Sequence, residues 1–400
     1  MVPEGWSYRT LEKASKIIDC KHRTPLYVNS GIPVISPGTI KWGEIDFDTP
    51  IKRVTQIEYE SLMDHCDIEA GDLVLSRNQS IGVASYVKTV KPFVLGQDTV
   101  LIKPKGNTDS RFLFYCFQDN KTQRIIFKLA GGSTFSRINL RDIRKLKLVF
   151  PPLPEQQKIA QILSTWDKVI DKLEALISAK QQRKKALMQQ LLTGKVRLPG
   201  FKGEWDYIKA KELFGTISRK KNVDEELLAV TQDQGVLPRS LLERKVVMPE
   251  GSTKGYKLVV PGNFIISLRS FQGGLEYSNY RGLVSPAYTV LKPIVKISDG
   301  FYRHYFKSYN FIGNLAVTVV GIRDGKQINY DDFSFLKLPY PKLEEQQKIA
   351  AVLSAADAEI EKHQQQLQAL KQQKKGLMQQ LLTGKKRVKL AADQLPATGT

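Results

Sequence analysis

Two long stretches of the chain show the spacing of apolar residues that is typical of a coiled-coil helix. In each stretch, apolar side chains recur mostly at alternating steps of four and three residues, which places them on one helix face. The first series is Ile159, Leu163, Trp166, Ile170, Leu173 and Ile177, and the second is Ile349, Leu353, Ala356, Ile360, Leu367 and Leu370. This pattern predicts two long helices that pair along these seam residues.

The two stretches are copies of one another. Residues 155–195 return without a gap at 345–385, with more than half of the positions identical. Each copy starts with a glutamate, which complements the positive end of a helix dipole, and ends at a Thr-Gly helix stop. The order of domain, helix, domain, helix favours an antiparallel pair that acts as a spacer. Lys180 and His363 each replace an apolar seam residue of the other copy, and such polar residues either fix register or turn towards water.

Outside the helices, the apolar pattern changes to short segments that glycine and proline interrupt. Such segments are typical of strands when β-branched and aromatic residues fill them. Strands are predicted within 33–37, 71–77, 82–87, 99–104, 145–150, 262–269, 287–293 and 335–340. Aromatic residues at helical spacing in 112–118 and 301–309 predict buried helices. The predicted fold class is α+β: two domains joined by two long antiparallel helices that form a coiled coil, in a pseudo-two-fold internal repeat.

The charge of the chain indicates a polyanionic partner. Its 400 residues include 61 Lys and Arg against 40 Asp and Glu, a formal net charge of +21. Solubility needs a much smaller excess, so double-stranded DNA or another nucleic acid is favoured over generic surface charge. No apolar run is long enough for a membrane span, and the first residues lack the apolar region of a signal peptide. We expect a cytoplasmic protein with no membrane partner.

Sequence patterns for catalysis and metal binding are missing. Cys20, Cys66 and Cys116 are odd in number and far apart, which argues against a disulfide framework or a cysteine zinc site, and we expect buried thiols. The four histidines form no i, i+4 pair. There is no glycine-rich phosphate loop, no HExxH segment and no methyltransferase catalytic loop. We expect no catalytic residues, no metal and no cofactor in this chain; a carboxylate cluster assembled from distant strands is the arrangement that sequence patterns leave open.

Polar and basic residues in the breaks between predicted strands are the candidates for contacting DNA. Arg can donate two hydrogen bonds to guanine, Asn or Gln pairs with adenine, and Lys mostly binds phosphate. In the first half they are Lys21, His22, Arg23, Thr24, Arg77, Asn78, Gln79, Ser80, Thr134, Ser136 and Arg137. In the second half they are Arg219, Lys220, Lys221, Asn222, Arg269, Ser270, Phe271, Gln272, Arg323, Lys326 and Gln327. Each alone is equally a solvated loop residue, but their clustering favours a binding surface.

Basic residues also gather near the distal ends of both helices, in 180–197 and 371–389. Part of this charge complements the negative helix ends, and we expect the remainder to contact phosphate or an acidic partner surface. Residues 389–400 are predicted to be a disordered tail or a tag, although 395–399 resembles a sortase motif.

Several segments together resemble a known family. They are PPLPEQQKIAQIL and PKLEEQQKIAAVL at the helix starts, LMQQLLTGK at the helix ends, IIDCKHRTP at 17–25 and GGSTFSRINLRDI at 131–143. These are similar to the specificity (HsdS) subunits of type I restriction-modification systems, and the likeness extends to Lys389. The second domain departs from this pattern at 217–222, where ISRKKN lacks the His-Arg-Thr-Pro segment.

The resemblance implies a non-catalytic subunit that recognises DNA. Target recognition domains at 1–153 and 197–343 would each read one half of a bipartite site. The repeat helices, at 154–196 and 344–388, would set the unread spacer and dock two modification (HsdM) subunits. Those partners would use S-adenosylmethionine to methylate adenine, and a restriction (HsdR) subunit would use ATP and Mg. The alternatives are a stand-alone basic nucleic-acid-binding protein and a coiled-coil scaffold with an acidic protein partner.

Overall fold

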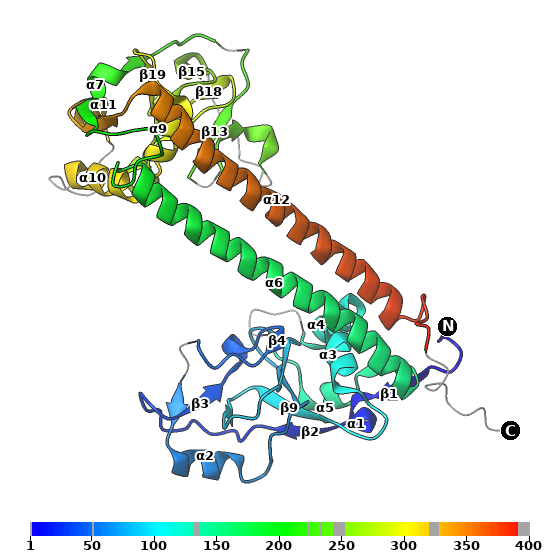
Figure 1. The fold of residues 1–400 in the computed structure, drawn as a ribbon. Helices are drawn as coiled ribbons and strands as arrows, with labels where there is room; N and C mark the ends of the chain where they lie inside the picture. The colour runs from blue at the N-terminus through cyan, green and yellow to red at the C-terminus, as the bar shows by residue number, and fades with distance from the viewer. Residues whose placement is uncertain are drawn as a thin grey trace. The chain divides into compact units, whose positions relative to one another are not determined.

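The computed structural model describes residues 2–49, 52–131, 136–222, 224–232, 234–242, 253–319 and 328–390. The chain divides into two compact units (Figure 1). The first unit combines Met1–Leu173 with Gln366–Thr400, and the second is Glu174–Gln365, so each unit holds part of both long helices. Within the described ranges, no helix combines the length and apolar character needed to cross a membrane.

A five-stranded sheet, in the order β2-β9-β6-β7-β4, organises the first unit. Its strands are β2 (Ser15–Asp19), β4 (Gly43–Glu44), β6 (Leu73–Ser76), β7 (Ala84–Tyr86) and β9 (Thr99–Pro104). Because successive strand residues point to opposite faces, Leu73 and Leu75 enter one apolar cluster and Val74 enters another. The sheet is covered on both faces, which explains why every residue of β6 is buried.

Smaller elements surround this sheet. The strands are β1 (Ser7–Thr10) paired with β10 (Lys147–Phe150), and β3 (Ile32–Ile35) between β5 (Arg53–Val54) and β8 (Val94–Leu95). The helices are α1 (Leu11–Ala14), α2 (Gln56–Met63), α3 (Ser110–Gln118), α4 (Asn120–Leu129) and α5 (Leu140–Arg144), with the 3-10 turn η1 (Pro37–Thr39). Phe112 and Phe117 of α3 are fully buried, which confirms the predicted aromatic helix.

The second unit repeats this framework. Its main sheet, β12-β19-β16-β17, matches β2-β9-β6-β7, and β11 pairs with β20 as β1 pairs with β10. These strands are β11 (Asp206–Lys209), β12 (Phe214–Ile217), β16 (Phe264–Ile266), β17 (Glu276–Tyr277), β19 (Thr289–Pro293) and β20 (Lys337–Tyr340). Alternation again divides the core, with Phe264 and Ile266 on one face and Ile265 on the other.

The additions to this framework differ between the units. The second unit carries the pairs β13 (Leu228–Thr231) with β14 (Gly235–Pro238) and β15 (Lys257–Val259) with β18 (Gly282–Val284). Its short helices are α7 (Ala210–Leu213), α8 (Ser270–Gly273), α9 (Asp299–Tyr305), α10 (Tyr309–Val319) and α11 (Tyr330–Ser334), with the 3-10 turns η2 (Arg239–Leu241) and η3 (Thr253–Gly255). Every segment predicted to be a strand overlaps one, so the α+β prediction is confirmed.

The two long helices are α6 (Leu153–Leu191) and α12 (Leu343–Leu382). In the first unit, Ile159 of α6 shares a core cluster with Leu381 of α12, and in the second unit Leu191 shares one with Ile349. The start of each helix therefore lies beside the end of the other, which confirms the antiparallel pairing. The buried seam residues are Ile159, Leu163, Ile170, Leu173, Ile177, Ile349, Leu353 and Ile360, and the half-buried ones are Trp166, Ala356, Leu367 and Leu370.

Candidate DNA-recognition surface

In the first unit, three of the predicted loops meet at the end of β2. Arg77 Nη1 lies 2.9 and 3.1 Å from the two carboxylate oxygens of Asp19, and His22 Nε2 lies 3.0 Å from Asp19 Oδ2. Arg77 Nε donates to the Ile138 carbonyl over 3.2 Å, and the Ile138 amide donates back to the Arg77 carbonyl. Asp19 and Arg77 thus join the loops around 22, 77 and 137 into one site.

The tip of this site presents Asn78, Gln79 and Arg137. Arg137 Nε lies 2.6 Å from Asp98 Oδ1, and Asn78 Nδ2 donates to Asp98 Oδ2 over 3.4 Å. Gln79 is exposed and has a φ of +55°, a left-handed conformation that its amide stabilises by donating to Asn78 Oδ1 over 2.6 Å. The turn projects its polar side chains outward instead of continuing β6. Ser80 fastens the turn by donating to the Pro37 carbonyl.

The loop at 21–24 is held by helix α2. Lys21 Nζ lies 2.6 Å from an Asp64 carboxylate oxygen, and Arg23 Nη1 lies 2.6 Å from Glu58 Oε1. The hydrogen bond from Arg23 lowers the pKa of Glu58. Arg23 and Thr24 are exposed. Because exposed ion pairs contribute little stability, these cations can exchange a carboxylate for a phosphate at small cost.

Two predicted contact residues do not have the exposure that base contact needs. Arg77 is only 4% exposed, and Ser270 only 1%. The Arg77 guanidinium is used within the protein by Asp19 and Ile138, and Ser270 Oγ accepts a hydrogen bond from the Ser267 amide over 2.8 Å. In this structure both side chains support their loops, and their contact with DNA stays a prediction.

The predicted residues of the second unit lie on two described loops. Arg219, Lys220 and Lys221 are exposed, and the Arg219 carbonyl accepts from the Leu258 amide over 2.8 Å. Arg269 and Gln272 are exposed around the half-buried Phe271, and Gln232 Nε2 donates to the Arg269 carbonyl. Asn222 is half-buried, and in the first unit so is Ser136. Thr134, Arg323, Lys326 and Gln327 lie outside the described residues.

The central ion pair of the first unit is not repeated in the second. Counting from the glycines that precede β6 and β16, Arg77 corresponds to Leu268, which is 48% exposed. Counting from Trp6 and Trp205, Asp19 corresponds to Ser218. The same sheet end therefore carries a charged, internally bonded loop set in one unit and a different set in the other.

A cluster that sequence reasoning missed fastens each domain to its helix. Glu155, only 2% exposed, accepts from Trp6 Nε1 over 3.1 Å and from Arg387 Nε and Nη2 over 2.7 Å each. In the second unit, Glu345 accepts from Trp205 Nε1 and from Arg197 over the same distances. The recurrence of Trp and Glu in the repeat is the signal that could have indicated these two Trp-Glu-Arg clusters.

Several cations of the predicted basic runs on the helices are paired inside the protein. Lys180 bonds Glu359 over 2.6 Å, Lys184 pairs with Asp357, and Lys374 pairs with Asp167. With Arg197 and Arg387 in the Trp-Glu-Arg clusters, five of these cations have carboxylate partners. Acids far away in sequence pair with these five cations in this structure. The expectation that the basic runs contact phosphate or an acidic partner surface stays a prediction.

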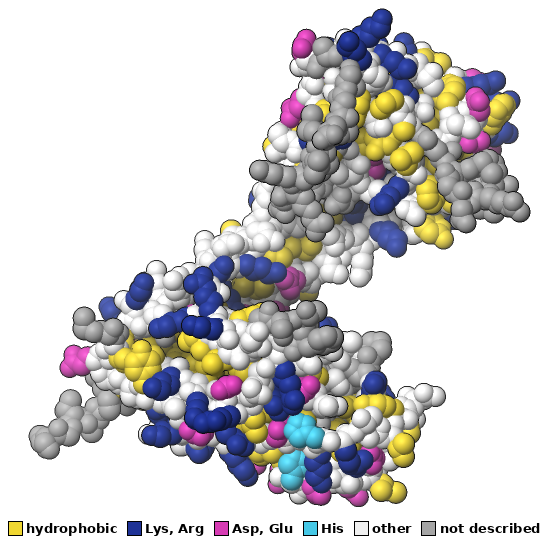
Figure 2. Space-filling model, turned by 180° about the vertical axis from the view of Figure 1, so that it is seen from behind, with side chains coloured by type: hydrophobic (Ala, Val, Ile, Leu, Met, Phe, Trp, Pro, Cys, Tyr) yellow, Lys and Arg dark blue, Asp and Glu magenta, His cyan; other side chains and the backbone are white. Residues whose placement is uncertain are grey.

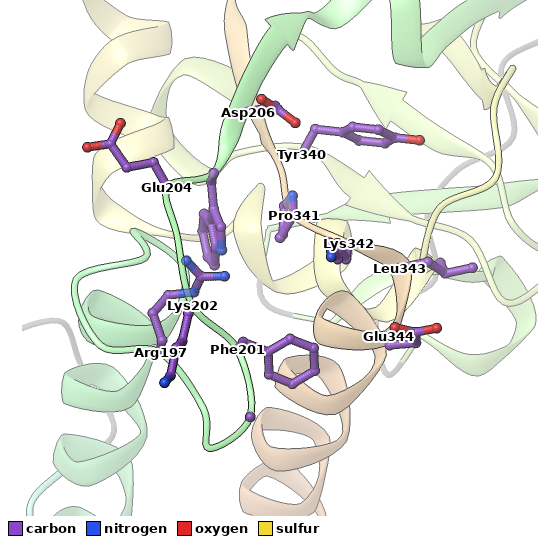
Figure 3. Close-up of a pocket in the computed structure, with 12 residues that line it drawn as sticks. Arg197, Phe201, Lys202, Glu204, Asp206, Tyr340, Pro341, Lys342, Leu343 and Glu344 are labelled. Atoms are coloured by element: carbon purple, nitrogen blue, oxygen red, sulfur yellow. The ribbon is translucent and has the colours of Figure 1, made fainter.

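A surface pocket of about 460 Å³ lies beside the second Trp-Glu-Arg cluster (Figure 3). Figure 3 shows Arg197, Phe201 and Lys202 from the segment before β11 on one side, and Lys342 and Glu344 at the start of α12 on the other. Its charged side chains have both signs, so the pocket does not select an anion.

The charge distribution agrees with a broad anionic partner. In the face shown in Figure 2, Lys and Arg side chains outnumber acidic ones over both units.

Asp19, Cys20 and His22 have potential ligand atoms within 4.8 Å of one another. A cation there would compete with Arg77 for Asp19, and burial followed by the Asp19 charge raises the pKa of the Cys20 thiol.

Comparison with known proteins identifies the family. The model for the type I restriction modification DNA specificity domain matches residues 3–180 and 202–372. A Methanocaldococcus jannaschii protein, provisionally the specificity subunit of the type I restriction enzyme MjaX, is 28% identical over 97% of this chain and 95% of its own length. The specificity subunit of MjaVIII from the same organism is 26% identical over 75% of this chain and 76% of its own length.

The fold has a counterpart among solved structures. The crystal structure of the type I restriction-modification S subunit from M. genitalium superposes with a TM-score of 0.60, at 16% identity, over 95% of this chain and 99% of that one. The two family matches fall on the two repeats, and each includes the beginning of a long helix. The chain therefore belongs to the type I restriction-modification DNA specificity family, as a non-catalytic subunit that recognises DNA sequence.

Proposed function

We propose that each unit reads one half of a bipartite DNA site and that the paired helices set the unread spacer. The observation that carries this proposal is the contrast between the frameworks and the loops. The sheets β2-β9-β6-β7 and β12-β19-β16-β17 correspond strand by strand, whereas Arg77 and Asp19 are replaced by Leu268 and Ser218. A shared framework with different loop chemistry suits two different half-sites.

In this proposal, the exposed and half-buried side chains make the contacts and the buried ones hold the loops. Gln79, Asn78 and Arg137 would meet base edges in the first half-site, and Lys21 and Arg23 would bind phosphates. Arg269 and Gln272 would meet bases in the second half-site, with Lys220 and Lys221 on phosphates. The recognition domains would comprise 1–153 and 197–343, the spacer helices 154–196 and 344–388, and the tail 389–400.

The helices would also dock two identical modification subunits. Exposed residues near the helix ends are the same in both copies: Gln182, Lys185 and Gln189 in α6, and Gln372, Lys375 and Gln379 in α12. The half-buried seam is less alike, since Trp166 corresponds to Ala356 and Lys180 to Leu370. Exposed residues that stay equal while the seam diverges are expected where one kind of partner binds twice.

The chemistry would belong to these partners, in the cytoplasm. The modification subunits would bind S-adenosylmethionine and methylate adenine, and restriction subunits, where present, would use ATP and Mg. This chain would supply the DNA sequence specificity. Its basic surface would contribute a salt-dependent attraction to any duplex, onto which the loops add sequence preference.

Two experiments test these proposals. Methylome sequencing of cells that express the chain with its modification subunit should give one bipartite motif, and a continuous motif would contradict the two-reader arrangement. Native mass spectrometry should find two modification subunits per chain, and one when either Lys185→Glu or Lys375→Glu is introduced. The double variant should bind none; a full complement in both single variants would place the docking surface elsewhere.

A further inference from the structure

Each unit contains a second three-residue cluster, farther along the helices than the Trp-Glu-Arg cluster. In the first unit, Tyr115 of α3 donates its hydroxyl to Asp167 of α6 over 2.6 Å, and Lys374 of α12 pairs with the same carboxylate. The ammonium of Lys374 lies 5.4 Å from the centre of the Tyr115 ring. Tyr115 is fully buried, and burial, with the Asp167 bond, raises the pKa of its hydroxyl, which stays a donor.

The second unit places equivalent residues in the same arrangement. His304 of α9 has Nδ1 3.8 Å from Asp357 Oδ2, and Lys184 of α6 pairs with Asp357. His304 Nε2 lies 3.3 Å from Ser354 Oγ on α12. Asp357 and Lys184 occupy the repeat positions of Asp167 and Lys374. Counted from the N-caps Asp109 of α3 and Ser298 of α9, His304 matches Tyr115. Both clusters thus join a recognition domain to both long helices.

Two attachments fix an orientation that one attachment leaves free. Glu155 and Asp167 are 12 residues apart on α6, about 18 Å along a helix, and Glu345 and Asp357 are equally spaced on α12. The Trp-Glu-Arg cluster, together with the apolar contacts of Ile159 or Ile349 beside it, would act as a pivot near the start of the helix. The second cluster opposes rotation about this pivot, because it attaches a buried helix of the domain to the same long helices. This buried helix is α3 in the first unit and α9 in the second.

We propose that Tyr115-Asp167-Lys374 and His304-Asp357-Lys184 are positioning clusters that set the tilt of each recognition domain on the helices, and with it the spacer length that the protein accepts. This inference rests on the proposed bipartite recognition. Helix length sets the distance available between the domains. The clusters determine how strongly the protein discriminates against a site whose spacer is one base pair longer or shorter. A recognition domain would have to tilt on the helices to contact its half-site in such a duplex.

The test uses the full chain and duplexes that carry the two half-sites with the native spacer, one base pair fewer, or one more, together with a duplex that retains one half-site. In Asp167→Ala, the preference for the native spacer should fall about tenfold, the size of one lost hydrogen bond to a charged group. Binding to the single half-site should stay within about twofold of the wild type, a factor worth less than a typical hydrogen bond. Asp357→Ala should do the same for the second unit, and Lys168→Ala and Glu361→Ala, which alter neighbouring exposed charges, should match the wild type.

Tyr115→Phe provides a variant that removes one oxygen and keeps the core filled. It should shift spacer preference in the same direction, by less. The inference is overturned if the variants keep the wild-type preference, or if affinity falls equally for every duplex, which would indicate a purely structural role. A wild-type chain that binds all spacers alike would overturn the bipartite proposal itself, and this inference with it.

Discussion

The acid sensitivity of the second unit should depend on His304. This side chain is 5% exposed and faces Ser354 and Asp357 of α12, Lys184 of α6 and its neighbour Arg303. Burial, and secondarily the Lys184 charge, lower its pKa from 6.5 to about 4, against the opposing effect of Asp357. His304 is therefore neutral in the folded protein at neutral pH, and the unfolded chain binds its proton more readily.

The direction of this pH dependence follows from proton linkage. Between about pH 6.5 and 4, His304 binds a proton in the unfolded state more readily than in the folded state. The free energy of unfolding is therefore undiminished by His304 above pH 6.5, and it falls with acidification towards pH 4. The full shift corresponds to about 3 kcal/mol, and at pH 5 about 2 kcal/mol of the free energy of unfolding should be lost relative to pH 7.5. A buried histidine that must become charged is the physical cause.

Urea unfolding followed by circular dichroism, for the wild type and His304→Gln at pH 7.5 and 5.0, measures this loss. Other titrating groups contribute to both proteins, so the difference between their pH-induced changes isolates His304 and should be about 2 kcal/mol, with the variant less acid-sensitive. Tyr115→Gln, at the equivalent position of the first unit, should show no such difference. A double difference near zero would refute the assignment of a buried, neutral histidine.

Three further predictions follow from the contacts. Glu155→Gln and Glu345→Gln should each lower the free energy of unfolding by about 1–3 kcal/mol, because a buried carboxylate that binds Arg and Trp loses its charge; thermal melts should show no comparable effect for the exposed Glu344→Gln. Leu381→Ala and Leu191→Ala should each cost about 2–5 kcal/mol in urea unfolding, since each removes a side chain 3% exposed from the core of one unit; effects below about 1 kcal/mol would contradict the helix pairing. Lys21→Glu with Arg23→Glu should weaken binding to random duplex and reduce the magnitude of its salt slope by about two, whereas the double charge reversal Lys13→Glu with Lys16→Glu, before and within β2, should leave the slope unchanged if 21–24 is the phosphate contact.

The framework could be predicted because it follows from local periodicity. The strands around Val74 and Ile265 are apolar runs between glycines, and the helices show a sustained seam, so their type depends little on distant residues. Strand β2 was missed: Ser15–Asp19 mixes polar and apolar residues and reads as neither pattern. Yet its last residue, Asp19, is the one that joins the loops of the first unit.

Pairings between distant residues could not be predicted in the same way. A basic residue at a helix end looks the same in sequence whether it meets water, phosphate or a carboxylate. Lys184 and Asp357 are 173 positions apart, and Glu155 and Arg387 are 232 apart. Only the antiparallel fold brings such partners together, so these ion pairs could not be predicted from the sequence, whereas the helices could. The same holds for Arg77, whose burial against distant residues could not be predicted from the sequence.

The helix pair shows that the two halves have become matched rather than interchangeable. Lys180 bonds Glu359 in the second unit. At the corresponding positions, the first unit carries Leu370 and Val169. A polar pair in one unit thus stands where the other has two apolar residues. Exchanging one member alone would set Lys180 against an apolar side chain, or Leu370 against a carboxylate. Exposed pairs contribute little stability, so the exchange would act mainly on pairing preference, through the desolvation of an unpaired charge. In the proposed function, the identical exposed residues near the helix ends would serve a repeated partner, while the facing residues of the seam would favour one combination of the two halves.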